Sequence, residues 1–180
     1  EQLALYDAHV QQMKQMLDGK SEAEFKSNKI QILAELTKLR QLCCDPALVY
    51  ENYEGGSAKL DLCIELIQSA VESGHKILLF SQFTSMIEIL TARLQEESIS
   101  CFVLQGSTKK EQRAQMVEQF NRDDTSVFCI SLKAGGTGLN LTGADIVIHY
   151  DPWWNVAVEN QATDREVCPA GRTLPKATDD

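Results

Sequence analysis

"SLKAGGTGLNLTGAD", residues 131–145, joins two apolar runs, "SVFCI" before it and "IVIHY" after it. Three of its glycines, Gly135, Gly136 and Gly138, lie close together. Because glycine loses more chain entropy on ordering than any other residue, a glycine-rich loop between two buried segments needs a reason. Glycine also lets backbone N–H groups approach a ligand closely, which indicates that this loop faces one.

Four short apolar runs alternate with helical patterns around this loop. The runs are "KILLF", "SCFVL", "SVFCI" and "DIVIHY", and amphipathic segments at 85–97 and 109–121 separate the first three. Such alternation predicts a parallel sheet with right-handed crossovers, and almost continuously apolar strands predict helices on both faces. We therefore expect residues 57–165 to form a doubly wound α/β domain. Thr108 and Glu111 predict a capping box at the start of its second helical segment.

The first 56 residues predict a helical arm and linker. Residues 1–17 and 29–44 place apolar side chains at helical spacing, and Pro46 ends the second of these segments. Ser57 is a suitable N-cap for a third helix over 58–73, with Gly74 as its C-terminal stop.

Composition limits the classes of function. The 180 residues correspond to one domain with an appendage, 43% are hydrophobic, and no segment has the apolar length needed to span a bilayer. The net charge of −9 argues against wholesale wrapping by DNA, so any nucleic-acid contact must come from a few placed groups. The six cysteines form no C-x-x-C pair, which disfavours a zinc site and favours reduced thiols in a cytosolic protein.

Ligands of a parallel sheet bind at the carboxyl ends of its strands. The segments that leave those ends are "SQFTS", "QGSTKKE", "SLKAGGTG" and "DPWWN". Polar loops follow most strands, but four on one edge favour a phosphate site, and Ser107 and Thr108 precede a helix N-terminus. No G-x-x-x-x-G-K-[ST] motif is present, and Leu141 stands where a dinucleotide fingerprint needs its third glycine. Asp151, before Pro152, is interpreted as a turn residue, and a second protein surface must complete the site.

From about residue 36 to Arg165 the chain resembles the second RecA-like lobe of the SWI/SNF-type, helicase-like ATPases of superfamily two. The resemblance is carried by "LTKLRQLCCDPALV", "SAKLDLCIELI", "HKILLFSQFTSMIEIL", "LQGSTKKEQR" and "SLKAGGTGLNLTGADIVIHYDPWWNVAVENQATDR". It implies ATP with Mg²⁺, bound mainly through a first lobe of the same polypeptide. It also implies double-stranded DNA as a partner, a nucleoprotein or polymerase as a substrate, and a place in the bacterial nucleoid or the eukaryotic nucleus.

The resemblance also implies roles for particular residues. Arg165 is the expected catalytic residue, and Gly136, Gly138 and Gln161 join it in contacting ATP. The residues expected to contact DNA are Ser81, Gln82, Ser107, Thr108, Arg113, Lys133, Thr137 and Trp154. By themselves, Lys133 and Arg113 are also typical of a solvated surface, and for Arg113 the two interpretations weigh about equally. Of Trp153 and Trp154, one is expected to belong to the core.

The C-terminus departs from the family pattern. After "QATDR" the family continues A-H-R-I-G-Q, whereas this chain continues "EVCPAGRTLPKATDD", with Cys168 where a second arginine belongs. Residues 166–180 are therefore predicted to be a disordered or non-native tail, with a diverged regulatory tail as the alternative. Two functions stay open: the second lobe of an ATP-driven DNA translocase, or a non-catalytic module that binds DNA or protein. A dinucleotide enzyme fits the α/β pattern but not the glycine spacing.

Overall fold

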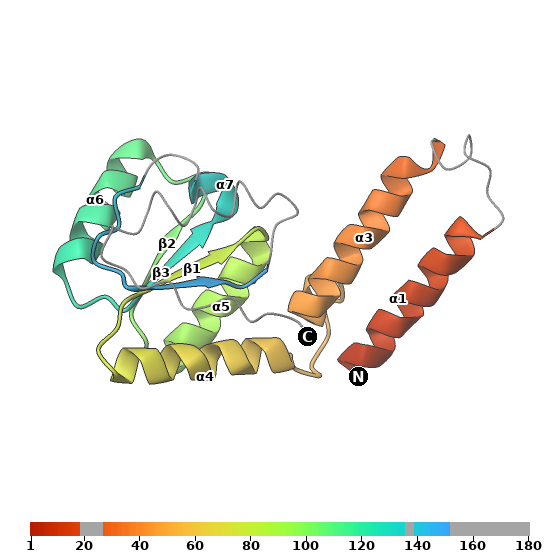
Figure 1. The fold of residues 1–180 in the computed structure, drawn as a ribbon, viewed down its shortest axis with the longest axis horizontal. Helices are drawn as coiled ribbons and strands as arrows, with labels where there is room; N and C mark the ends of the chain where they lie inside the picture. Colours follow the sequence, from red (N-terminus) through yellow and green to blue (C-terminus); the bar gives the residue numbers. More distant parts are fainter. Residues whose placement is uncertain (19–26, 136–138, 152–180) are drawn as a thin grey trace, which may run out of the picture. The chain divides into compact units, whose positions relative to one another are not determined.

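The computed structural model describes residues 1–18, 27–135 and 139–151 (Figure 1). The chain forms two compact units that divide between Glu65 and Leu66, within helix α4 (Ala58–Glu72). The sequence-based boundary at residue 57 corresponds to the start of this helix and stays a prediction. Among the described helices, none combines the length and the apolar character that crossing a bilayer requires.

Within its described residues, the first unit has two helices that pack against each other, α1 (Gln2–Leu17) and α3 (Lys29–Cys44), followed by the short 3-10 helix η1 (Pro46–Leu48). Both long helices match the predicted segments. A partly buried contact joins them, in which His9 Nδ1 lies 3.3 Å from Glu35 Oε2. On the exposed side, His9 Nε2 lies 2.9 Å from the hydroxyl of Tyr50. The hydrogen bond from Lys38 outweighs the desolvation of Glu35 and lowers the pKa of its carboxyl group.

Within its described residues, the second unit is built on a sheet of four parallel strands. In chain order these are β1 (Ile77–Ser81), β2 (Cys101–Leu104), β3 (Val127–Ser131) and β4 (Ile146–His149), and in space their order is β2-β3-β1-β4 (Figure 1). The predicted strands and their parallel arrangement are confirmed. The strand order, with β1 between β3 and β4, is new information from the structure.

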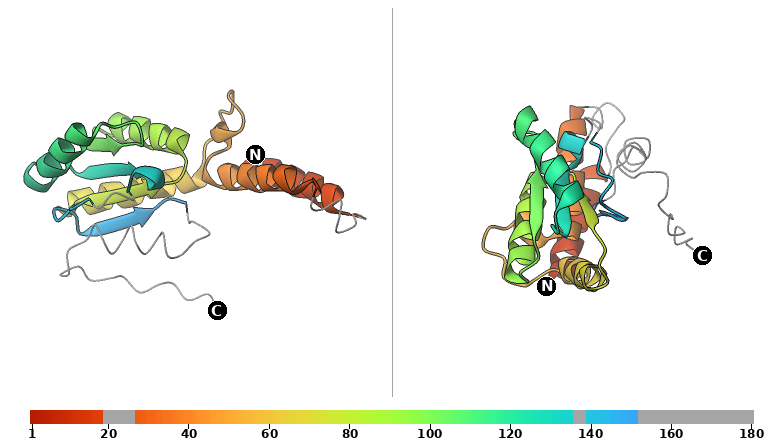
Figure 2. Two further views of the ribbon diagram at one scale, coloured as in Figure 1. Left: turned by 90° about the horizontal axis from the view of Figure 1, so that it is seen from above. Right: turned by 90° about the vertical axis from the view of Figure 1, so that its left-hand side faces the viewer.

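Helices cover both faces of this sheet, as predicted (Figure 2). On one face, α6 (Lys110–Arg122) contributes Phe120 to a buried cluster with Phe128 of β3 and Phe80 of β1. The Phe120 and Phe128 rings meet edge to face with 5.2 Å between their centroids. Helix α5 (Thr84–Glu96) contacts β1, β2 and β3 and buries four apolar side chains outside that cluster: Met86, Ile87, Leu90 and Leu94. The sheet is therefore a central layer, which leaves its carboxyl edge as the place for a ligand.

The ends of α4 follow the predicted capping pattern. At its start, the backbone N–H of Leu60 donates to Ser57 Oγ at 3.4 Å, which confirms Ser57 as the N-cap. At its end, Gly74 has a φ of 82°, and the amides of Gly74 and His75 donate to the carbonyls of Val71 and Ala70. These paired bonds are those of a Schellman motif, in which a residue with a left-handed backbone stops the helix.

Gly74→Ala should destabilise the protein by about 1 kcal/mol, because a Cβ is strained at a left-handed φ. The midpoint of urea unfolding, followed by circular dichroism, measures this loss. Gly106→Ala is the matched control, since that glycine has no left-handed φ and open space where a Cβ would stand. Equal shifts of the midpoint for the two variants would contradict the Schellman assignment.

The predicted capping box of Thr108 and Glu111 is wrong. Helix α6 begins at Lys110 with Lys109 as its N-cap, and no side chain caps it. The Thr108 hydroxyl instead accepts a hydrogen bond from the backbone N–H of Gln105 at 3.1 Å. Because this bond closes the turn that precedes the helix, the hydroxyl belongs to the turn and not to the helix N-terminus.

Candidate functional site

The four segments that the sequence predicts at one edge do leave the carboxyl ends of four parallel strands. The described residues that directly follow the strands are 82–83 after β1, 105–109 after β2, 132–135 after β3 and 150–151 after β4. The segment after β3 forms a single helical turn, α7 (Leu132–Gly135), which includes the backbone of Lys133. Ser107 is exposed in the turn after β2, and Thr108 beside it is half-buried.

Asp151 ties the end of β4 to the end of β1. Its carboxylate is 3% exposed and accepts hydrogen bonds from Ser81 Oγ at 2.5 Å and from the backbone N–H of Gln82 at 3.1 Å. The sequence suggested only a turn residue here, because 70 positions separate Asp151 from Ser81 and nothing local reveals that β1 and β4 are neighbours. Asp151 therefore fixes the conformation of two residues that were predicted to contact DNA.

Arg113 makes a comparable connection between the other two segments. Its guanidinium group donates to the carbonyl oxygens of Thr108 at 2.9 Å, Gly106 at 3.2 Å and Gln105 at 3.3 Å, all in the turn after β2. It also donates to the carbonyl of Ala134 in α7 at 3.4 Å. Every one of these acceptors is a main-chain atom, so the side chain holds two loops in one arrangement.

Two buried polar atoms lie where β1 and β3 end side by side. Ser131 is 1% exposed and pairs with Ser81 across the two strands. Within the described residues, neither Ser131 Oγ nor Gln82 Nε2 has a hydrogen-bond partner. An unmet buried polar group costs about 1–3 kcal/mol, and both groups can donate.

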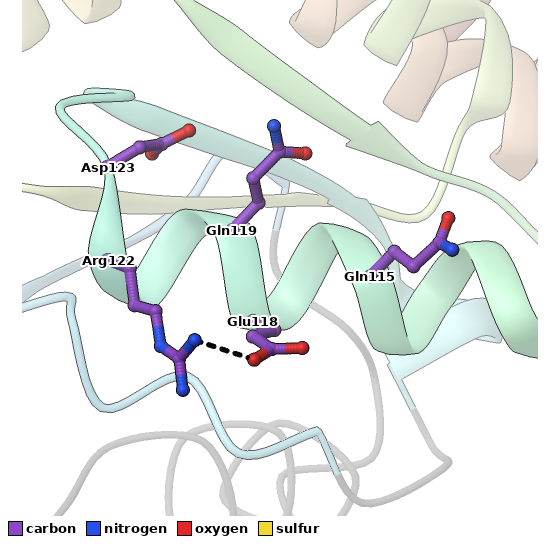
Figure 3. A pocket seen from close by; sticks show the side chains of 5 residues that line it. All are labelled: Gln115, Glu118, Gln119, Arg122 and Asp123. Carbon is purple, nitrogen blue, oxygen red and sulfur yellow. Dashed lines mark ion pairs between the residues drawn. The ribbon is translucent and has the colours of Figure 1, made fainter.

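Two hollows border α6 in the described part of the chain. One, of about 520 Å³, lies between Arg113 and Val117 of the helix and Leu139 and Asn140, which follow the glycine-rich loop. The other, of about 440 Å³, lies along the polar side of the same helix, where Glu118 and Arg122 form an ion pair of 2.8 Å (Figure 3). The second hollow draws its side chains from α6 and Asp123 alone, and its ion pair is largely exposed, so it offers little for recognition.

Two titratable pairs lie away from the carboxyl edge. Asp145, just before β4, accepts from the Lys76 backbone at 3.0 Å and lies 2.5 Å from His75 Nδ1. Partial burial raises the pKa of Asp145, but these hydrogen bonds outweigh it, so its pKa is lowered. On the strands themselves, a hydrogen bond with Cys129 lowers the pKa of Cys101 to about 7. Both pairs join neighbouring strands.

Six of the predicted site residues lie outside the described residues: Gly136, Thr137, Gly138, Trp154, Gln161 and Arg165. The expected ATP contacts and the expected catalytic arginine are among them, so all of these roles stay predictions. The structure does bring Ser81, Gln82, Ser107, Thr108 and Arg113 to the same edge of the sheet, together with the backbone of Lys133. The contacts of Asp151 were not anticipated.

Comparison with known proteins agrees with this architecture. Residues 58–168 match the helicase conserved C-terminal domain. A Bacillus subtilis protein named as an ATP-dependent helicase/translocase, YwqA, is 41% identical over 172 residues, which cover 92% of this chain and 18% of the relative. The chain therefore spans less than a fifth of the length of this relative.

Solved structures of archaeal proteins are also similar. The C-terminal domain of the Sulfolobus solfataricus SWI2/SNF2 ATPase superposes with a TM-score of 0.76 at 34% identity, covering 92% of this chain and 72% of that domain. The core of the same ATPase in complex with double-stranded DNA gives a TM-score of 0.77 at 32% identity, covering 96% of this chain and 36% of the core. The family match, the identities and the RecA-like parallel sheet agree: the chain belongs to the SWI2/SNF2 family of ATPases, of which it is the helicase C-terminal lobe.

Proposed function

We propose that this lobe is the second motor lobe of an ATP-dependent, double-stranded DNA translocase. The observation that carries the proposal is the gathering of four family-like segments at one edge of the sheet. A related SWI2/SNF2 core has been solved with double-stranded DNA, and YwqA is named as an ATP-dependent helicase/translocase. Both facts support a motor function for the longer protein to which such a lobe belongs.

In this proposal the DNA contacts are made to the phosphate backbone. Ser107 and Thr108 lie in the turn after β2, where their hydroxyl groups can donate to phosphates. Ser81 and Gln82, which are bound to Asp151, shape the neighbouring part of the edge at the end of β1. Lys133 supplies the positive charge, and Thr137 a hydroxyl, from the loop after β3. Trp154 lies beside the DNA path. Contacts of this kind fix the position of a duplex without reading its sequence, as a translocase requires.

The nucleotide is proposed to lie between this lobe and the first lobe of the same polypeptide, which would supply most contacts to ATP and Mg²⁺. From this chain, the backbone amides of Gly136 and Gly138 are proposed to face the phosphates, together with Gln161 and Arg165, which are four positions apart in the sequence. The guanidinium of Arg165 stabilises the charge that develops on the transferred phosphoryl group. Closure of the two lobes then advances the duplex, and the glycines allow the loop to change shape.

One observation favours a second candidate, a module that binds DNA or a protein without ATP hydrolysis. Cys168 stands where the family has a second arginine, and Pro169 follows it. A lobe that lacks this arginine could keep its binding surface while contributing little to catalysis. The ATP hydrolysis experiment that opens the Discussion separates the two candidates.

DNA binding by the chain should be weak, independent of sequence and steeply reduced by salt, because it rests on phosphate contacts. Lys133→Ala should weaken binding uniformly and reduce the slope of log K against log salt by about 1. Fluorescence anisotropy with two unrelated duplexes over a range of salt concentrations measures both quantities. Arg122→Ala, which removes an equal charge at the far end of α6, should leave the slope unchanged. Tight, salt-insensitive binding to one sequence would overturn the translocase proposal.

A further inference from the structure

The side chain of Arg113 forms hydrogen bonds to the main chain of two loops, as expected of a structural residue and not of a ligand-binding one. All three nitrogens of the guanidinium group donate to main-chain carbonyls: Nε to Thr108, Nη1 to Ala134, and Nη2 to both Gln105 and Gly106. Of these four carbonyls among the described residues, three belong to the turn after β2, and the fourth belongs to α7, after β3. β2 and β3 are neighbours in the sheet, so the side chain spans two adjacent loops.

A planar guanidinium group suits this task, and an ammonium group does not. Arginine presents five N–H donors in a fixed fork, whereas lysine presents three donors from a single point. The carbonyls that Arg113 binds lie on two different loops, and Ala134 is 21 positions away from Arg113 in the sequence. Only a group whose donors point in several directions can bind such carbonyls together. The positive charge of a lysine at this position would not by itself hold the two loops together.

We propose that Arg113 is a positioning residue: it holds the turn of residues 105–108 against α7, so that the two loops meet the DNA phosphates as one preassembled surface. The sequence-based alternative, in which Arg113 itself contacts a phosphate, is set aside by this proposal. The inference rests on the proposed function for what the surface binds, but the tie between the loops does not depend on it.

Arg113 and Asp151 each connect two of the four segments at the carboxyl edge of the sheet. Arg113 connects the segments after β2 and β3, and Asp151 connects the segments after β1 and β4. The two connected pairs meet at the junction of β1 and β3, where Ser131 Oγ and Gln82 Nε2 have no hydrogen-bond partner within the described residues. Arg113 therefore organises one half of the edge.

Hydrogen exchange on the DNA-free chain tests the tie directly. In Arg113→Lys, which keeps the charge, amide exchange should rise on the order of tenfold in both 105–108 and 132–135, because charge-assisted hydrogen bonds are lost. Exchange in β1 should stay unchanged. Arg122→Lys, on the same helix and with its side chain exposed, should alter neither loop. If only one loop responds to Arg113→Lys, or neither, Arg113 does not connect them and the proposal fails.

DNA affinity then distinguishes positioning from direct contact. If Arg113 positions the loops, Arg113→Lys should lose about as much affinity for duplex DNA as Arg113→Ala, on the order of tenfold. If Arg113 is a phosphate ligand, Arg113→Lys should keep most of the affinity and the wild-type salt slope, which would overturn the proposal. When both loops loosen in Arg113→Lys but the wild-type chain shows no DNA binding at low salt, the tie stands and the proposed function fails.

Discussion

Replacing the residues after Arg165 with the family continuation A-H-R-I-G-Q should raise DNA-stimulated ATP hydrolysis by ~10³–10⁵. The comparison requires a fusion in which a cognate first lobe precedes Glu1, because this chain holds no phosphate-binding motif with a lysine. With the tail as it stands, the fused protein has Arg165 but has Cys168 where the second arginine belongs. An arginine that stabilises the charge on the transferred phosphoryl group accounts for rate effects of this size in related nucleotidases.

The measurement is the steady-state rate of ATP hydrolysis at saturating duplex DNA for the two tails, with folding matched by circular dichroism. Arg165→Ala in the fusion with the restored tail is the control, and its rate should fall back by a similar factor. Similar rates for the two tails would mean that Cys168 marks no catalytic gap. A restored tail that leaves the protein inactive but still able to bind DNA would favour the non-catalytic module.

Phe128→Ala should destabilise the protein by about 3–5 kcal/mol, the second largest effect that we expect. Phe128 lies in the interior strand β3, is fully buried, and packs against Phe120 at 5.2 Å and Phe102 at 5.8 Å between ring centroids. Its removal opens a cavity between the sheet and α6 that the rigid sheet cannot close. Urea unfolding followed by circular dichroism measures the change in the free energy of unfolding.

The control for this prediction is Ile30→Ala, which also truncates a large apolar side chain. Ile30 is 82% exposed on α3, so its loss should change the free energy of unfolding by less than about 0.5 kcal/mol. Comparable destabilisation by the two variants would show that the cluster around Phe128 does not dominate the stability of the lobe.

The helices and strands could be predicted from the sequence because their signals are local. The apolar runs "KILLF" and "SVFCI" match β1 and β3 to within a residue at each end, and Ser57 and Gly74 mark both ends of α4. The order of the strands could not be predicted in this way. The position of β1 between β3 and β4 depends on how the helices pack on both faces of the sheet. A short stretch of sequence contains no information about this packing.

The site was less predictable, because its geometry comes from contacts between distant residues. The carboxylate of Asp151 bonds to Ser81, and the guanidinium of Arg113 bonds to Ala134, and neither pair is close in the sequence. Thr108 shows that a local sequence pattern can also give a wrong prediction. Its spacing to Glu111 satisfies the capping-box pattern, but a bond to Gln105 within the preceding turn competes for the same hydroxyl and prevails.

The strand order also determines when the sheet can be completed during synthesis. β1 pairs with none of its neighbours in sequence: Ile77 pairs with Val127 and Ile146, both far downstream. Such non-local pairing gives a high contact order and slow folding. Until the ribosome has delivered β4, the largely apolar strand β1 keeps one edge open, and an unpaired apolar edge is prone to aggregate. The strand that precedes Asp151 therefore covers the remaining open edge of β1 as soon as it has been made.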